Sequence, residues 1–255
     1  MKNIALFCVD ESRKLETEKL SRTLNIAYIQ NASDMEKFSI LLIVTKNYIG
    51  IQFNSKNAPT PVFVDFLHGK LKHRKQFGGG KNQLIGRAIG MKSKEKLSVL
   101  DLTAGLGEDA FILATLGCNV VMCEKSKIIH AVLQDGLKRA LKETWFQNLS
   151  LKLIHIDSLN YLLQLDSNDY PDIIYLDPMF PNQHKTALNK KEMRIIKAIV
   201  GDDVDSEKLF NLALSKVKKR IVVKRARLAP SIGNQKPDIV FEGKSSRFDV
   251  YLKSH

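Results

Sequence analysis

From residue 97 onward, short apolar runs alternate with helix-like segments, and this alternation limits the possible folds more than any other feature. Apolar strands separated by helices are typical of a parallel sheet covered on both faces, because each helix returns the chain to the end of the sheet where the strands begin. The sequence therefore predicts an α/β fold. The predicted strands are residues 97–102, 119–124, 151–155, 172–177 and 220–225, and the predicted helices are residues 109–116, 128–141, 158–163, 190–199 and 206–218.

Two further extended runs close the chain, at residues 238–242 and 248–252. Only five residues separate them, which is too short for a parallel crossover connection. We therefore expect these two strands to pair antiparallel. The complete prediction is a seven-stranded, mostly parallel sheet with an antiparallel last strand.

The first part of the chain has a different pattern. Extended runs at residues 4–9, 40–44, 48–53 and 62–66 accompany one helical segment at residues 11–24. Asn47 between the second and third runs favours a hairpin or adjacent strands. We expect a small N-terminal α+β subdomain over residues 1–68, a basic glycine-rich connection over residues 69–96, and the main domain over residues 97–255.

Composition indicates the class of partner and the compartment. Lys and Arg number 40 against 27 Asp and Glu, a net charge of +13, which favours a polyanion such as nucleic acid. The three cysteines lack metal-type spacing and suit reduced, buried thiols. No apolar stretch reaches the roughly 18 residues of a membrane span. The expected protein is cytoplasmic, without a metal and without a membrane partner.

A glycine-rich loop follows the first strand of the main domain. Gly105, Gly107 and Ala110 match the spacing of the dinucleotide-binding fingerprint, and Glu124 follows Gly105 by 19 residues at the tip of the next strand. A carboxylate at that spacing binds ribose hydroxyls. Two cofactors fit this arrangement, a dinucleotide and S-adenosylmethionine.

The charge of the loop separates these two cofactors. Glu108 and Asp109 occupy the helix start where a pyrophosphate would bind, and Asp101 lies beside them. Carboxylates repel a pyrophosphate but attract the ammonium and sulfonium of S-adenosylmethionine. Asp157 and Ser158, at the third strand tip, suit the adenine amino group, although the same pair is also a good helix cap. The sequence therefore favours S-adenosylmethionine.

The fourth strand ends in Asp177-Pro178-Met179-Phe180. The Asp177 carboxylate and the Pro178 carbonyl can accept hydrogen bonds from an exocyclic amine, and Phe180 can stack on a planar base. Alone, an Asp-Pro pair at a strand end is compatible with an ordinary turn. Because ligands of open α/β sheets bind at the carboxyl ends of the strands, we predict that these residues hold the group that is methylated.

Basic residues near these loops are candidates for RNA binding. The cations before and within the glycine run at residues 78–80 either follow a phosphate backbone or belong to a flexible linker, and the sequence leaves both possibilities open. The predicted RNA-binding residues are Arg74, Lys75, Lys81, Lys190, Lys191, Arg194, Lys224 and Arg225.

Six segments, standing in a characteristic order, resemble the family of bacterial small-subunit ribosomal RNA guanine-N2 methyltransferases of the J type. The resemblance covers most of residues 60–252. The segments are residues 73–80 (HRKQFGGG), 101–107 (DLTAGLG), 175–181 (YLDPMFP), 191–194 (KEMR), 222–225 (VVKR) and 247–249 (RFD).

This resemblance implies a class I, Rossmann-like methyltransferase fold, S-adenosylmethionine as donor and N2-methylguanosine in 16S ribosomal RNA as product. Glu108 stands where the family often has a basic residue, so the charge argument rests on Asp109 and Asp101. The cofactor contacts that the resemblance implies are Glu108, Asp109, Glu124, Lys125, Asp157, Ser158 and Asp177.

Two other functions are compatible with the residues. The same strand-tip chemistry serves an adenine-N6 methyltransferase acting on DNA or RNA, because both reactions need a held exocyclic amine. A non-catalytic RNA-binding or assembly protein with this fold is the third possibility. The nucleoside that becomes methylated distinguishes the first two, and the effect of replacing Asp177 distinguishes both from the third.

Overall fold

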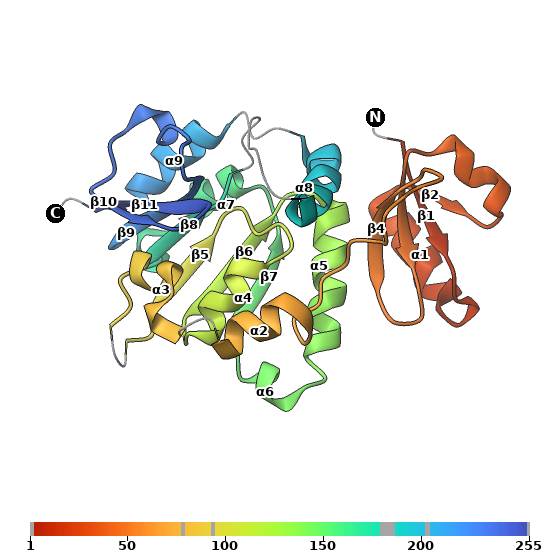
Figure 1. Cartoon of the computed structure of the whole chain (residues 1–255), viewed down its shortest axis with the longest axis horizontal. Helices are drawn as coiled ribbons and strands as arrows, with labels where there is room; N and C mark the ends of the chain where they lie inside the picture. The colour runs from red at the N-terminus through yellow and green to blue at the C-terminus, as the bar shows by residue number, and fades with distance from the viewer. Residues whose placement is uncertain (1–2, 78–79, 93–94, 179–186, 202–204, 254–255) are drawn as a thin grey trace. The chain divides into compact units, whose positions relative to one another are not determined.

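The computed structural model describes residues 3–77, 80–92, 95–178, 187–201 and 205–253. The chain divides into two compact units (Figure 1). The first comprises Met1–Asp65, Ser126–Ala140 and His184–Gly201, and the second comprises Phe66–Lys125, Leu141–Gln183 and Asp202–His255. The boundaries at residues 68 and 96 expected from the sequence remain a prediction.

The second unit contains the seven-stranded sheet, which confirms the predicted fold class. Its order is β10-β11-β9-β8-β5-β6-β7. The five strands from β9 to β7 are parallel, whereas β11 pairs antiparallel with both β9 and β10. The strands are β5 (Ser98–Asp101), β6 (Asn119–Glu124), β7 (Leu151–His155), β8 (Ile173–Leu176), β9 (Arg220–Ala226), β10 (Ile239–Glu242) and β11 (Ser246–Leu252).

Helices cover both faces of this sheet. Ile174 and Leu176 of β8 pack on one face with Leu162 of α7 and Phe210 of α9. Figure 1 shows α2 and α4 on the opposite face. The alternation along β8 therefore directs Tyr175 toward α4. The helices of this unit are α2 (Gly69–Phe77), α3 (Leu84–Ala88), α4 (Glu108–Thr115), α6 (Thr144–Gln147), α7 (Ser158–Gln164) and α9 (Ser206–Ser215).

The segment expected to be a glycine-rich connection contains helices instead. Five of the nine residues of α2 are Lys, His or Arg. Too few apolar residues remain to show helical periodicity, so the sequence did not predict this helix. Leu71 is its anchor, with 7% of the residue exposed. The basic side chains before the glycines thus project from a helix and not from a flexible linker, and their contact with a phosphate backbone remains a prediction.

The first unit has a four-stranded sheet of order β2-β1-β3-β4. Strands β3 (Ile40–Val44) and β4 (Ile49–Phe53) form the expected antiparallel pair. Strand β2 (Ala27–Ile29), parallel to β1 (Ile4–Cys8), was not predicted because it has three residues. The expected strand at residues 62–66 is wrong, since only Val62 makes a bridge, to Ile51. The unit also contains α1 (Lys14–Leu24), α5 (Lys127–Ala140) and α8 (Ala187–Val200).

In the described segments, no helix is long and apolar enough to cross a membrane. The same residues contain no group of three or more His, Cys, Asp or Glu side chains placed to hold a metal ion.

Candidate active site

Acidic residues follow the carboxyl ends of four neighbouring strands in the second unit. Asp101 ends β5, Glu124 ends β6, Asp157 follows β7 and Asp177 follows β8. Strand β5 has β6 on one side and β8 on the other, so the chain reverses its direction of travel across the sheet at β5. Such a switch point leaves a crevice where open α/β sheets bind ligands.

The glycine loop lies against the acid of the next strand. Gly105 donates its N–H to Oε2 of Glu124 at 3.1 Å. Both Gly105 and Gly107 have positive φ, 53° and 74°, a conformation that favours glycine. A Cβ added at Gly105 would meet no atom nearer than 3.9 Å, so the left-handed backbone rather than crowding requires glycine there.

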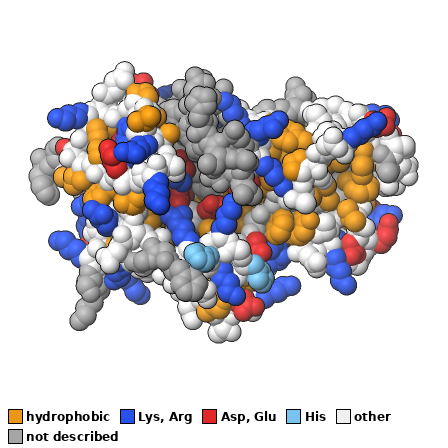
Figure 2. Space-filling model, in the orientation of Figure 1, with side chains coloured by type: hydrophobic (Ala, Val, Ile, Leu, Met, Phe, Trp, Pro, Cys, Tyr) orange, Lys and Arg blue, Asp and Glu red, His pale blue; other side chains and the backbone are white. Residues whose placement is uncertain are grey.

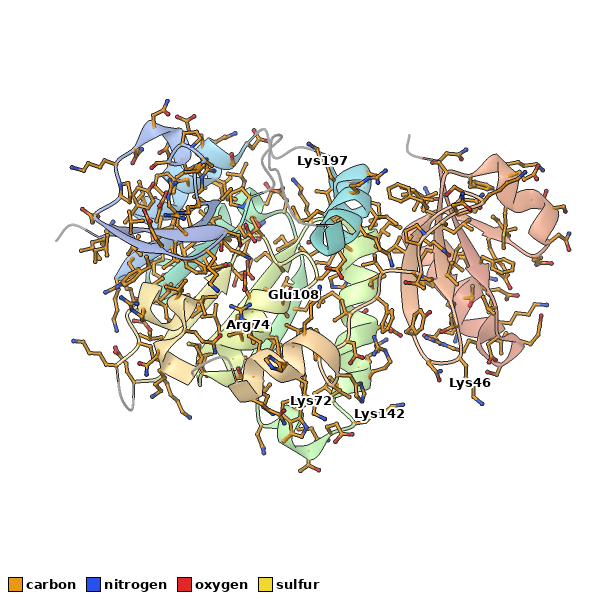
Figure 3. The ribbon with its side chains drawn as sticks, viewed as in Figure 1. Lys46, Lys72, Arg74, Glu108, Lys142 and Lys197 are labelled. Carbon is orange, nitrogen blue, oxygen red and sulfur yellow. The ribbon has the colours of Figure 1, made fainter. Side chains whose placement is uncertain are left out.

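Asp109 lies at the centre of a network of ion pairs and hydrogen bonds. Its Oδ1 is 2.8 Å from Nη1 of Arg74, while its Oδ2 accepts from Tyr175 at 2.8 Å and from Lys224 at 2.5 Å. Burial raises the pKa of Asp109, but the charges of Lys224 and Arg74 outweigh burial and hold that pKa well below its ordinary value. Figure 3 shows Arg74 and Glu108 in this region.

These contacts revise the charge argument. Asp109 was expected to attract the positive end of S-adenosylmethionine, yet two cations of the chain already pair with its carboxylate. Asp101 is the less compensated acid, with 2% of the residue exposed and one hydrogen bond from the Thr103 N–H at 3.0 Å. Burial, aided by the carboxylates of Asp109 and Asp177, raises the pKa of Asp101 to about 7. Glu108 begins α4 and is exposed.

Asp177 is fixed from both sides of the switch point. Its N–H donates to Oγ1 of Thr103 at 2.6 Å, and its Oδ2 lies 2.9 Å from Nζ of Lys224. The side chain is nevertheless 34% exposed, whereas Pro178 is buried. Sequence reasoning missed Thr103 and Tyr175 as members of this site. Two signals pointed to them: both stand within two residues of a predicted site acid, and both lie in segments that carry the family resemblance.

Three other predicted cofactor residues lie near the tips of β6 and β7. Asp157 caps α7 by accepting from the Asn160 N–H at 3.1 Å. Ser158 is buried and donates to the Leu102 carbonyl at 2.6 Å, so it joins α7 to the end of β5. Lys125 is exposed, and its carbonyl lies 3.2 Å from Nε2 of His155. Contacts of these residues with adenine remain a prediction.

The two predicted RNA-binding residues of β9 make their contacts within the fold, where Arg225 is buried and Lys224 is partly buried. Lys224 is paired with Asp109 and Asp177. Arg225 is 3% exposed, and its guanidinium donates to the Pro230 carbonyl. Neither placement favours a contact with an RNA backbone.

The other predicted RNA-binding residues are distributed over both units. Lys75 lies over the ring of Trp145 in the second unit, where Lys81 is exposed. In the first unit, Lys191 donates to Thr60 and Arg194 lies over Phe53. Figure 2 shows Lys and Arg spread over the visible face rather than gathered in one patch. The side chain of Lys190, like the whole of Met179 and Phe180, lies outside the described residues.

Comparison with known proteins decides the family. A family model described as putative SAM-dependent methyltransferase matches residues 25–253. The ribosomal RNA small subunit methyltransferase J of Coxiella burnetii is 48% identical over 242 residues, which cover 94% of this chain and 93% of that protein. The protein of the same name from Cellvibrio japonicus is 46% identical and covers 84% of this chain and 83% of its own length. This protein belongs to the methyltransferase J family.

A solved structure agrees with this assignment. The SAM-dependent methyltransferase of Neisseria gonorrhoeae superposes with a TM-score of 0.74 at 29% identity, covering 98% of this chain and 96% of that one. The expected class I methyltransferase fold and family are thereby confirmed.

The strand-tip residues of this methyltransferase fit S-adenosylmethionine. Glu124, 7% exposed and held by the Gly105 N–H, presents a carboxylate where ribose hydroxyls bind in such folds. Asp101 is a buried carboxyl group whose ionised form an ammonium would stabilise. When bound, the cofactor supplies an electrophilic methyl group on its sulfonium. Asp101, Glu124 and the Gly105 loop are the residues that we assign to its amino-acid and ribose parts.

Proposed function

We propose that this protein transfers a methyl group from S-adenosylmethionine to the exocyclic N2 amine of a guanosine in 16S ribosomal RNA. One observation carries the proposal: Asp177 and Pro178 follow β8 at the switch point, directly beside β5 and its glycine loop. Relatives at 46–48% identity are named ribosomal RNA small subunit methyltransferase J, which supports the class of substrate.

Asp177 has the features of a group that positions an amine. The lone pair of an exocyclic amine is delocalised into the ring, so aim matters more than acid–base power. A carboxylate accepts an N–H of the amine, and the Pro178 carbonyl is a second acceptor beside it. Because Thr103 fixes the backbone of Asp177 and Lys224 fixes its carboxylate, the acceptor is oriented in advance.

The substrate must present the base outside a helical stack. An enzyme cannot reach its target atom on a base that is stacked inside a duplex, so enzymes acting on bases use single-stranded or flipped nucleotides. The net charge of +13 supports a polyanionic partner. We therefore assign 16S ribosomal RNA, free or within the small ribosomal subunit, as the partner.

The test uses ribosomal RNA and small subunits from cells that lack this protein. Each is incubated with the wild-type protein and methyl-labelled S-adenosylmethionine, and the labelled nucleosides are then separated. N2-methylguanosine is the expected product. Labelled N6-methyladenosine would assign the enzyme to the adenine class, and RNA binding without any label would favour a non-catalytic protein.

An Asp177→Asn variant tests the assigned role. It preserves shape but replaces one acceptor oxygen by a donor, so we expect transfer to slow about 100-fold or more, the scale of losing one oriented polar group in an active site. Its thermal unfolding temperature is measured in parallel, to show that the variant folds. A folded variant with wild-type transfer would remove Asp177 from the mechanism.

A further inference from the structure

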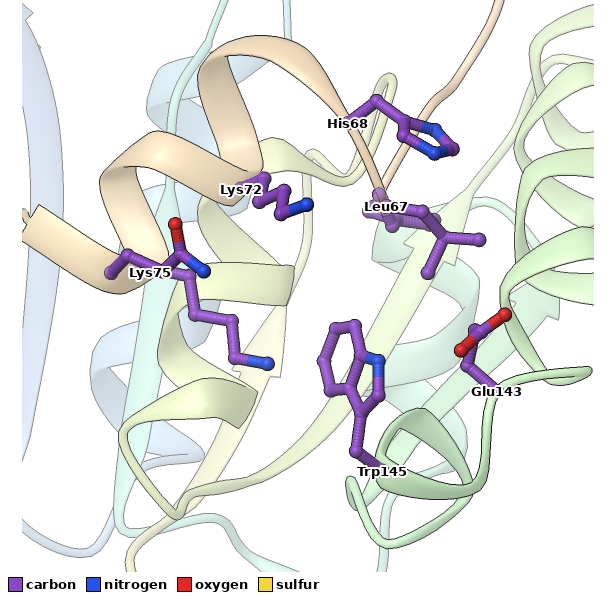
Figure 4. Close-up of a pocket in the computed structure, with 8 residues that line it drawn as sticks. Leu67, His68, Lys72, Lys75, Glu143 and Trp145 are labelled. Carbon is purple, nitrogen blue, oxygen red and sulfur yellow. The ribbon is translucent and has the colours of Figure 1, made fainter.

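The second unit has a separate cavity of about 250 Å³ between α2 and the start of α6. Figure 4 shows Lys72 and Lys75 extending into it from α2, with Trp145 and Glu143 on the other side. His68 and Gln76 complete its polar lining, and none of the lining residues belongs to the cofactor or amine site described above.

The Trp145 ring is braced by neighbouring aromatic side chains. Phe146 meets it edge-on, with centroids 5.6 Å apart, and Phe111 does the same at 6.4 Å. Over its face lies the ammonium of Lys75, 3.0 Å from the ring centroid. The ring is thus half-buried and oriented, while the group that covers it is a long, flexible side chain.

The charge and size of the cavity indicate the class of ligand. Lys72 and Lys75 carry two positive charges against the one negative charge of Glu143, so an anionic ligand is favoured and a cationic one is not. A volume of 250 Å³ lies just below the range of about 300–1,000 Å³ typical of small-molecule sites. An aromatic face flanked by cations is the arrangement with which proteins hold single-stranded nucleic acid.

We propose that this cavity binds one unstacked nucleotide of the RNA substrate. The base takes the place of the Lys75 ammonium over the Trp145 ring, and Lys75 and Lys72 then pair with the phosphate. Burial beside the ring lowers the pKa of Lys75, which means that the charged ammonium is disfavoured there. Pairing with a phosphate would stabilise that charge. This inference rests on the proposed RNA substrate and adds a second contact to it.

Helix α2 connects the cavity to the active site. Arg74 reaches Asp109 in the active-site network, while the next residue, Lys75, reaches Trp145 in the cavity. Consecutive helical residues point about 100° apart, so one turn of α2 faces both places. An RNA strand whose target base enters the active site can therefore place another nucleotide in the cavity.

Trp145 is the single tryptophan of the chain, so its fluorescence reports this site directly. The full-length protein is titrated with a short unstructured RNA oligomer that carries a fluorescent label at one end. Binding is followed by anisotropy and stacking by tryptophan emission. We expect quenching with the same midpoint as the anisotropy change. RNA binding without quenching, or no RNA binding, overturns the proposal.

Variants separate stacking from charge. Trp145→Leu removes the stack and is expected to weaken oligomer binding about tenfold, whereas Trp145→Phe keeps a ring and loses less than about threefold. The double variant Lys72→Gln/Lys75→Gln is expected to weaken binding at least about tenfold and to reduce its salt dependence. Lys218→Gln, an exposed lysine outside the cavity, is the matched control. An effect of Trp145→Leu or of the double lysine variant no larger than that of Lys218→Gln would contradict the assignment.

A second comparison identifies the source of the nucleotide. Guanosine 5′-monophosphate is expected to quench Trp145 only far above the oligomer's midpoint, and equal affinities would overturn the assignment to an RNA strand. Methyl transfer to ribosomal RNA is measured separately. Wild-type transfer with no quenching rejects the cavity alone, whereas quenching without transfer rejects the proposed reaction alone.

Discussion

The ammonium of Lys224 lies 2.9 Å from Oδ2 of Asp177 and thereby joins the strand that carries the predicted amine acceptor to the neighbouring strand β9. The same ammonium lies 2.5 Å from Oδ2 of Asp109. Burial lowers the pKa of Lys224, but its two carboxylate partners outweigh burial and raise that pKa above its ordinary value. Lys224 therefore stays charged and orients both acids.

Replacing this lysine separates charge from packing. Lys224→Met keeps most of the side-chain volume but removes the cation that pairs with Asp177. Of the two cations that pair with Asp109, only Arg74 remains. We expect methyl transfer to fall at least about tenfold and the free energy of unfolding to fall by about 1–2 kcal/mol, because about a quarter of the side chain is solvated. Denaturant unfolding and a transfer assay measure the two effects.

Lys224→Arg is the charge-preserving partner of that variant. It retains a cation beside both acids, so its stability is expected to stay closer to wild type than that of Lys224→Met. Equal losses in both variants would show that lysine geometry, and not charge, holds Asp177.

The buried Asp101 makes stability depend on pH in a defined direction. Its pKa is raised to about 7 in the fold, against about 3.9 in an unfolded chain. Below pH 4 both states hold the proton. Between pH 4 and 7 the unfolded chain loses the proton first, so stability falls as pH rises through this window and levels off above pH 7. The full cost is at most about 4 kcal/mol.

Asp101→Asn removes this titration and serves as its measurement. The difference in unfolding free energy between wild type and variant cancels the contribution of other groups. From pH 5.5 to 8 we expect the variant to gain about 2 kcal/mol relative to wild type, by denaturant unfolding. A difference that does not change with pH would show that Asp101 is ionised throughout.

The strands of the large sheet were predictable from the sequence because local residues decide them. Ile173, Ile174 and Leu176 are fully buried, and an uninterrupted apolar run ending in a polar residue marks such a strand. Residues 62–66 show where that logic fails. Val62, Val64 and Phe66 are buried as alternation predicts, yet burial does not supply the hydrogen-bonding neighbour that makes a strand.

The gathering of the acids at neighbouring strand ends was predictable from the sequence, but the partners of each acid were not. Their positions follow from strand ends and spacing, which are local. The state of Asp109 depends on Arg74, 35 residues before it, and on Lys224, 115 residues after it. A pattern within one segment does not contain pairings at such separations, so Asp109 looked like a ligand-facing charge when the fold compensates it internally.

Glu124 provides a direct test of the cofactor assignment. Glu124→Gln retains an oxygen for the Gly105 N–H but loses the charge, and we expect the affinity for S-adenosylmethionine to fall about tenfold or more, as for a hydrogen bond to a charged group. Glu124→Ala also leaves the Gly105 N–H without this acceptor and should bind more weakly still. Calorimetric titration measures both. Asp169→Asn, an exposed acid, is the control, and affinities indistinguishable from it would exclude Glu124 from the cofactor site.

Two acids of the first unit, Asp135 of α5 and Glu16 of α1, pair with Arg13. We expect Asp135 to contribute more to stability than Glu16. The side chain of Asp135 is 8% exposed, and its Oδ2 accepts from the Ile49 N–H at 3.0 Å and from Arg139 at 2.9 Å. Asp135→Ala leaves both donors without this acceptor, so we expect a loss of about 3 kcal/mol in denaturant unfolding.

Glu16→Gln is the matched control for Asp135, because Glu16 also pairs with Arg13, at 2.7 Å, but is 51% exposed. A half-solvated pair contributes less than about 1 kcal/mol. If Asp135→Ala proved no less stable than Glu16→Gln, burial would not be the reason for the contribution of Asp135 to stability.

Gly136→Ala tests the packing beside Asp135 without changing a charge. The added Cβ would lie 2.5 Å from Cγ1 of Val64, so relief of the overlap is expected to lower the free energy of unfolding by about 1–3 kcal/mol.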